Sequence, residues 1–185
     1  LGLVNLGSLA SERGDYGGAQ ELLEQALEMS ERFADDSTDA ITRAAILNNL
    51  AIVATRRGDL ERAEGLFARV LAVREHHLPD SGAVASALNN LSVVRIERGR
   101  LAEAEASLRR SLEIRRALDP DGTSTTWTLT NLGHVLRMRG DLDSAETVYR
   151  EAIAVEERHG EGGLRGSWAL QGLGDVSMQR GDLAA

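Results

Sequence analysis

Residues 129–153 read LTNLGHVLRMRGDLDSAETVYREAI, and this stretch decides the fold. Leu129, Leu132 and Val135 recur every three residues, which predicts a helix with one apolar stripe. Gly140 ends that helix, since a residue without a Cβ atom suits the left-handed conformation that follows a helix C-terminus. The next residue is an Asp, a good N-cap, and further apolar residues then recur at helical spacing. The stretch therefore predicts two antiparallel helices joined by a tight turn.

The same pattern recurs along the whole chain. A repeat Leu stands at positions 6, 50, 91, 132 and 173, so the spacing is 44 residues once and 41 thereafter. A Gly follows each Leu eight positions later, at 14, 58, 99, 140 and 181. The residue directly after each Leu is small, which lets two helices approach closely: Gly7, Ala51, Ser92, Gly133 and Gly174. Helix pairs that recur at a fixed period bury their stripes against neighbouring pairs, as in a solenoid.

One position of the repeat departs from the pattern. An Asp follows the turn Gly in four repeats, as Asp15, Asp59, Asp141 and Asp182, whereas Arg100 takes this place in the third. We therefore expect the second helix of repeat three to lack the side-chain cap of the others, a difference of about 1 kcal/mol.

The repeats form one array in this prediction. Short polar connections separate them, at residues 34–37, 76–81, 119–122 and 160–163. They contain both prolines, and none is long enough to be an interdomain linker. We expect repeats near residues 1–37, 38–81, 82–122 and 123–163, with a half repeat at 164–185. The first residue falls inside a helix and the last falls where a second helix should begin, without polar capping faces. We therefore expect a segment of a longer protein.

Composition excludes several classes of function. The 185 residues carry a net charge of −8, all 21 basic residues are Arg, and there is no Cys. Disulfides, thiolate catalysis and Cys-ligated zinc are therefore excluded. The acidic balance argues against nucleic acid as a partner, because binding to phosphates needs a basic surface. No apolar stretch is long enough to span a membrane, so we expect no membrane partner and a cytoplasmic location.

Residues for catalysis or metal binding do not converge in the sequence. The turn at 119–122 resembles the start of a calcium loop but lacks the Glu expected at the twelfth position. No nucleophile motif such as Gly-x-Ser-x-Gly is present. The His residues are scattered, two of them in the expected connection at 76–81: His76, His77, His134 and His159. We therefore expect no metal, no cofactor and no enzyme activity.

Equivalent positions of the aligned repeats, which we call columns, carry residues that resemble the pattern of the tetratricopeptide repeat (TPR) family. Its pattern is matched by Asn5-Leu6-Gly7 and Gly14-Asp15-Tyr16, followed by Ala19, Leu23 and Ala26. The period exceeds the usual length of about 34 residues, and openings such as Leu47-Asn48-Asn49-Leu50 resemble the kinesin-light-chain variety. That variety is common in bacterial multidomain proteins, which the Arg-only, Ala-rich composition also favours. The resemblance implies an all-α fold, a right-handed α-solenoid of antiparallel helix pairs.

The resemblance also implies a binding surface, because the first helices of TPR arrays line a concave groove. The residue before each repeat Leu would face this groove, as a ladder of Asn5, Asn49, Asn90 and Asn131 that ends in Gly172. Each carboxamide offers a donor and an acceptor to a peptide backbone, or bridges adjacent helices instead. The other expected groove residues are Ile52, Arg56, Val93, Trp127, His134, Arg137 and Trp168. For the two Trp residues, packing between repeats and ligand contact both stay open.

These features predict a noncatalytic protein–protein interaction scaffold. Its partner would be a peptide, another protein or another domain of the parent chain, held in the groove. The alternative is the sensor or autoinhibitory arm of a bacterial signalling ATPase, transcription regulator or protease, which the flanking sequence would reveal. End-to-end self-association is a further hypothesis, since apolar stripes would be exposed at both ends.

Overall fold

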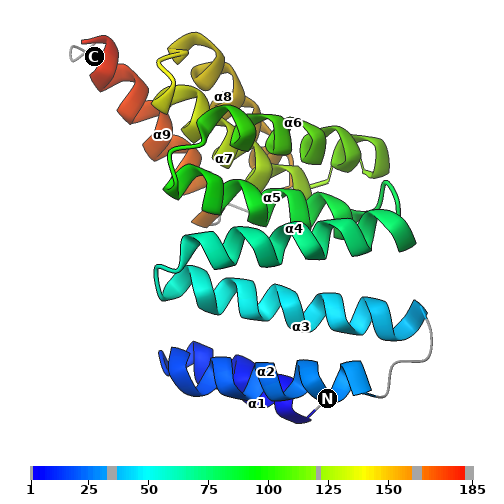
Figure 1. The fold of residues 1–185 in the computed structure, drawn as a ribbon. Coiled ribbons are helices and arrows are strands. Elements are labelled where there is room, and N and C mark those ends of the chain that lie inside the picture. The colour runs from blue at the N-terminus through cyan, green and yellow to red at the C-terminus, as the bar shows by residue number, and fades with distance from the viewer. Residues whose placement is uncertain (1, 33–36, 120–121, 160–163, 182–185) are drawn as a thin grey trace. The chain divides into compact units, whose positions relative to one another are not determined.

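A computed structural model of the chain describes residues 2–32, 37–119, 122–159 and 164–181 (Figure 1). These residues form helices and turns with no strand among them, so the all-α prediction is confirmed. No helix in this part of the chain is long and apolar enough to cross a membrane. The helices are α1 (Gly2–Glu12), α2 (Tyr16–Arg32), α3 (Ser37–Arg56), α4 (Leu60–His77), α5 (Gly82–Glu97), α6 (Leu101–Leu118), α7 (Ser124–Met138), α8 (Leu142–His159) and α9 (Leu164–Arg180).

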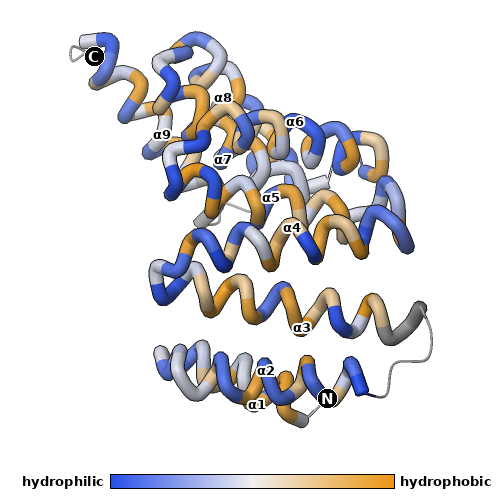
Figure 2. The backbone as a smooth tube through the Cα atoms, in the orientation of Figure 1, coloured by the Kyte–Doolittle hydropathy of each residue, from blue (hydrophilic) through white to orange (hydrophobic). Residues whose placement is uncertain are grey.

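The helices group into two compact units, Leu1–Arg98 and Gly99–Ala185. In the first unit, α1 to α4 each pack on the next helix in the chain, and α1 also touches α3. In the second unit, α6 to α8 do the same, and α7 also packs on α9. Apolar and polar residues are interspersed along every helix (Figure 2), as expected of helices that bury one face. The pairs α1–α2, α3–α4 and α7–α8 within these units are therefore helix pairs that the repeat predicts.

The turn between the two helices of a repeat forms as the pattern predicts. Gly140 has a φ of +83°, a conformation that L side chains rarely adopt. The Asp141 carboxylate accepts a hydrogen bond from the Ser144 backbone N–H at 3.2 Å and so caps α8. Arg100 makes no side-chain cap to α6, which confirms the expected departure in repeat three. The other turn glycines also have positive φ: Gly14, Gly58, Gly99 and Gly181.

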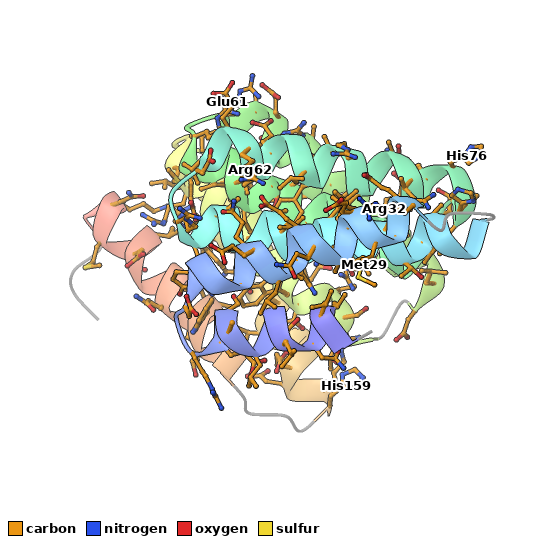
Figure 3. The ribbon with its side chains drawn as sticks, turned by 60° about the horizontal axis from the view of Figure 1, so that its bottom comes forward. Met29, Arg32, Glu61, Arg62, His76 and His159 are labelled. Carbon is orange, nitrogen blue, oxygen red and sulfur yellow. The ribbon has the colours of Figure 1, made fainter. Side chains whose placement is uncertain are left out.

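The connection predicted at 76–81 is wrong at its start. His76 and His77 lie in the last turn of α4 (Figure 3), and the Leu78 N–H donates to the Arg74 carbonyl at 2.8 Å. Basic residues are favourable there because they face the negative end of the helix dipole. The connections expected at 34–37 and 160–163 lie wholly or largely outside the described residues, as do two residues of the one at 119–122.

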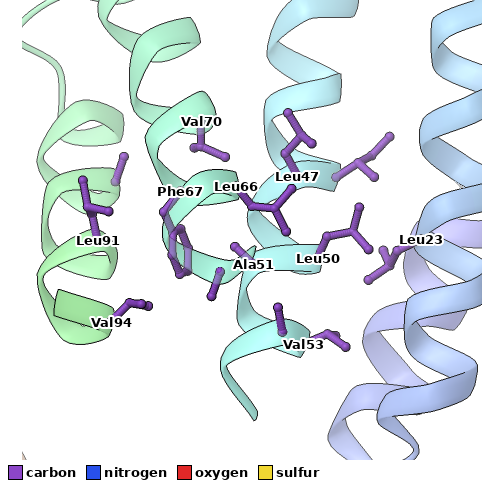
Figure 4. Packing of buried hydrophobic residues seen from close by; sticks show 14 of the residues in the cluster. Leu23, Leu47, Leu50, Ala51, Val53, Leu66, Phe67, Val70, Leu91 and Val94 are labelled. Carbon is purple, nitrogen blue, oxygen red and sulfur yellow. The ribbon is translucent and has the colours of Figure 1, made fainter. Parts of the chain in front are cut away.

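The core of the first unit contains the predicted apolar stripes (Figure 4). Leu50 and Val53 of α3 are 3% and 1% exposed, and Phe67 of α4 is 3% exposed. In the second unit the corresponding stripe of α7, with Leu132 at 2%, is buried as well. Leu6 is 54% exposed, because the described helices leave that side of α1 uncovered. The repeat Leu is therefore a core residue wherever a neighbouring helix covers it.

A second set of contacts, which the apolar pattern did not predict, links neighbouring repeats. The residue before the turn Gly is Arg in every repeat, and the sixth residue after that Gly is Glu or Gln in the first four. From the second repeat on, each Arg donates to the Glu or Gln of the preceding repeat. The pairs are Arg57 with Gln20, Arg98 with Glu64, Arg139 with Glu105, and Arg180 with Glu146. We call these four pairs the Arg column.

The Arg column is best protected at Glu64, whose side chain is only 10% exposed. Arg95 Nε lies 3.2 Å from Glu64 Oε1, and Arg98 contacts the other carboxylate oxygen. Replacing both Arg residues by Ala leaves a buried carboxylate without either cation, and we expect it to lower the free energy of unfolding by about 3 kcal/mol. Chemical denaturation measures this loss.

The control is Arg62→Ala. Arg62 pairs with Glu24 at 2.5 Å, but the two side chains are 40% and 45% exposed. An ion pair of this kind is worth less than about 1 kcal/mol. Equal losses in the two variants would contradict the stabilising role of burial in the Arg column.

Candidate functional site

The Asn ladder is partly engaged within the protein. The Asn49 carboxamide donates to Ser8 Oγ at 3.3 Å, and the Asn90 carboxamide donates to Asn48 Oδ1 at 3.2 Å. Each bond joins the first helix of one repeat to the first helix of the preceding repeat. Asn5 is exposed on α1. At Asn49 and Asn90 the structure thus shows the bridging role, and contact with a peptide stays a prediction.

The first unit has an open pocket between α1 and α3. Its volume is about 230 Å³, and Ser8, Glu12, Asn49 and Ile52 are among the residues that line it. Ile52 is 38% exposed, so this pocket offers apolar surface. Two further predicted groove residues lie outside its lining: Arg56 is exposed at the end of α3, and Val93 is half-buried on α5.

The second unit has a larger pocket between α7 and α9, of about 300 Å³. We call it the α7–α9 pocket. Four predicted groove residues line it together: Asn131, His134, Arg137 and Trp168. It is also lined by Thr130, Tyr149, Gln171, Gly172 and Asp175. The pocket lies where α7 packs on α9, the first helices of two neighbouring repeats.

An ion pair crosses the α7–α9 pocket. Arg137 Nη2 lies 3.4 Å from Asp175 Oδ2, and the two side chains are 17% and 32% exposed. The same Arg137 nitrogen lies 3.5 Å from His134 Nδ1. Burial, and next the charge of Arg137, lower the pKa of His134, while Asp175 acts in the opposite direction. The imidazole is therefore neutral at neutral pH.

The two Trp residues combine the two roles that the sequence left open. Their ring centroids are 5.0 Å apart with a tilt of 44°, so Trp127 on α7 packs on Trp168 on α9. Trp127 is half-buried, whereas Trp168 keeps 50% of its surface exposed and lines the pocket. Packing between repeats thus accounts for Trp127, and Trp168 has surface left for a ligand.

Tyr149 shapes the floor of the pocket, although its column predicts only a core residue. Its ring lies between α7 and α9: a Cβ atom at Gly133 would be 2.7 Å from the ring, and one at Gly172 would be 2.3 Å from it. Burial raises the pKa of the Tyr149 hydroxyl, and a hydrogen bond with Arg137 partly offsets this. The signal in the sequence is that Tyr is the one polar-tipped residue in a column of Leu23, Phe67 and Leu108.

Gly172 interrupts the Asn ladder because the Tyr149 ring fills the space that a side chain would need. We expect Gly172→Asn, which restores the ladder residue, to lower the free energy of unfolding by about 1–3 kcal/mol through overpacking. The same substitution should cost much less in a Tyr149→Leu background. A double-mutant cycle by chemical denaturation measures the coupling. Additive effects would contradict this account of Gly172.

The lowered pKa of His134 predicts a dependence of stability on pH. The unfolded chain has the ordinary His pKa of about 6.5, so it binds this proton first as the pH falls. The contribution of neutral His134 to the free energy of unfolding is therefore fully present above pH 6.5 and is lost progressively as the pH drops below it. His134→Gln should remove this part of the decline between pH 7 and 5, as measured by urea denaturation at each pH. An identical slope in wild type and variant would show that His134 does not titrate in this way.

No group of His, Asp or Glu residues suited to hold a metal ion occurs in the described part of the chain. The α7–α9 pocket presents hydrogen-bond donors and acceptors, one ion pair and an exposed aromatic ring. These are the groups that bind peptide side chains and backbone.

Comparison with known families decides the identity of the repeat. Two models described as tetratricopeptide repeat match the sequence, one over residues 4–76 and the other over residues 42–117 and 83–158. The chain belongs to the tetratricopeptide repeat family. No match was found among curated protein sequences. TPR proteins are in general non-catalytic scaffolds for protein interaction, and the TPR match makes this chain a scaffold with protein or peptide partners.

Solved structures of other TPR proteins share the fold. BtubC (BKLC) from P. vanneervenii has a TM-score of 0.85 and 24% identity, over 97% of this chain and 72% of that chain. A putative kinesin light chain of Podosopora anserina has a TM-score of 0.82 and 17% identity, over 98% of this chain and 87% of that one. The prediction of a kinesin-light-chain-like TPR fold is thus confirmed.

A Rap protein complexed with Competence and Sporulation Factor is also similar. The TM-score is 0.76 and the identity 17%, over 97% of this chain and 48% of that chain. This chain therefore spans about half the length of the Rap protein. At such identities the likeness concerns the fold alone.

Proposed function

We propose that this TPR chain binds an extended peptide segment of a partner protein along the first helices of its repeats, without catalysing a reaction. The observation that carries the proposal is the lining of the α7–α9 pocket. Asn131, His134, Arg137 and Trp168 come from two different helices, and they meet in one open pocket. The segment could belong to a separate protein or to another part of the parent chain.

The first unit supports the same mode of binding. Its pocket also lies between first helices, α1 and α3, and combines a ladder carboxamide with apolar surface from Ile52. A peptide needs both kinds of group, since its backbone requires donors and acceptors and its side chains require apolar contacts.

The walls of both pockets are held before a ligand arrives. Asn49 is bonded to Ser8 in the first unit, and Arg137 is paired with Asp175 in the second. Side chains that are already ordered lose less conformational entropy on binding, which favours affinity. The Rap protein complexed with Competence and Sporulation Factor also supports the proposal, since it is a protein of the same fold with a bound factor.

The test is a selection of displayed random peptides on the 185-residue chain, followed by measurement of the affinity of the selected peptides. We expect the double variant Asn131→Ala, Trp168→Ala to bind them at least tenfold more weakly than wild type. The matched control is Glu113→Ala, an exposed position on α6 of the same unit. Full affinity in the double variant would remove the α7–α9 pocket from the proposal, and circular dichroism checks that each variant is folded.

A further inference from the structure

The α7–α9 pocket is the place where several repeat columns change together. Trp127 and Trp168 stand where repeats two and three have Ala45 and Ser86. Within the same repeats the column of Ser8, Ile52 and Val93 continues as His134 and Asp175, and Gly172 replaces the ladder Asn. A residue needed only for the packing of repeats would recur at the equivalent position of each repeat. Several positions that change together around one pocket therefore indicate a dedicated site.

The face of α9 in this pocket forms a slot. Trp168, Gly172 and Asp175 are separated by four and three residues and so lie on one side of the helix. Gly172 has no side chain, and the Tyr149 ring lies over its backbone as the floor of the pocket between the other two. Trp168 and Asp175 are seven residues apart, or about 10 Å along the helix axis. The slot therefore suits a long, unbranched side chain that lies lengthwise between an aromatic ring and a carboxylate.

The accessible charge in the slot is negative. Arg137 is 17% exposed: its Nη2 faces Asp175 and His134, the side chain also bonds Tyr149, and its Nε is buried without a hydrogen-bond partner. Asp175 is 32% exposed and uses Oδ2 for Arg137. Within the described part of the chain, its other oxygen, Oδ1, accepts no hydrogen bond. A carboxylate can accept from two cations through its two oxygens, so Asp175 can bind a second cation beside Arg137.

The other groups of the pocket favour the same kind of ligand. Trp168 is half-exposed, and the Trp ring is the aromatic surface that attracts cations most strongly. His134 adds no positive charge at neutral pH, because its pKa is lowered. The net charge of −8 also attracts cationic segments as they approach.

We infer that the α7–α9 pocket receives a cationic side chain, Arg or Lys, of the bound peptide, with its aliphatic stem along Trp168 and its charged head at Asp175. This inference rests on the proposed peptide-binding function and names the chemistry of the ligand at this site. A Lys or Arg stem packs on apolar surface while its head stays with a polar partner, which is the arrangement that the slot provides.

The test changes the ligand and leaves the protein intact. Peptides selected on the chain are resynthesised with each Arg replaced by citrulline, which has the same shape without the charge, or each Lys by norleucine. Binding is followed by Trp fluorescence, because the chain has two Trp residues and both belong to this pair. We expect one cation whose loss lowers affinity at least tenfold.

Variants of the protein then show whether that cation of the peptide binds at Asp175. In Asp175→Asn the charged and the citrulline or norleucine peptides should bind with affinities within about threefold of each other, whereas Asp175→Glu should restore the preference for charge. Glu113→Gln, which removes an exposed carboxylate on α6, should leave the preference unchanged. Because the comparison is between two peptides on one protein, a loss of stability in a variant does not imitate the result.

The outcomes separate the inference from the proposed function. If peptides require Asn131 and Trp168 but tolerate the loss of every cation, the inference is overturned and peptide binding stands. If a cation matters equally in wild type and Asp175→Asn, the inference is overturned as well. If no selected peptide depends on Asn131 and Trp168, both the inference and the proposed function fail.

Discussion

The close approach of the two helices within a repeat is the contact on which the rest of the structure depends. A Cβ atom at Gly7 would lie 2.8 Å from Leu23 Cγ, and one at Gly133 would lie 2.7 Å from the Tyr149 ring. Ala51 and Ser92, fully buried, occupy the same column in repeats two and three. Because the small residue admits a bulky partner from the second helix, the opposite side of the first helix is left for neighbouring repeats and, in the proposed function, for a peptide.

This arrangement separates stability from recognition. Stacking relies on columns that repeat, namely the buried Leu and Val stripes and the Arg column, which joins each repeat to the preceding one within a unit. Recognition can then rely on positions that are free to change. In the second unit Trp168, Gly172 and Asp175 have changed, while Leu132 and Ala145 still pack as their columns require. The α7–α9 pocket is thus a local modification of a regular scaffold.

The fold could be predicted from the sequence because its signals are repeated. Leu50, Leu91 and Leu132 predict the same buried stripe, and the positive φ of Gly140 follows from a column that contains only Gly. The end of α4 was not predicted, since His76 and His77 are polar and precede Pro79, which resembles a connection. The Arg, Glu and Gln residues of the Arg column stand at fixed positions of the repeat, but they were not predicted to pair because the prediction relied on the spacing of apolar residues.

The sequence predicted which residues of the candidate site share a face, but not how their side chains interact. Asn131, His134, Arg137 and Trp168 were expected on one face, and they line one pocket. The pair between Arg137 and Asp175 depends on how α7 and α9 pack across 38 residues of sequence, which no local pattern specifies. Tyr149 was assigned to the core, and its 2% exposure agrees, yet its hydroxyl also reaches Arg137.

Hydrogen–deuterium exchange with and without a selected peptide tests most directly whether the first helices are the binding surface. Protection at residues 124–138 and 167–180, with little change on α6 and α8, is the result that the account predicts. Protection confined to α6 and α8, with α7 and α9 unaffected, would contradict it.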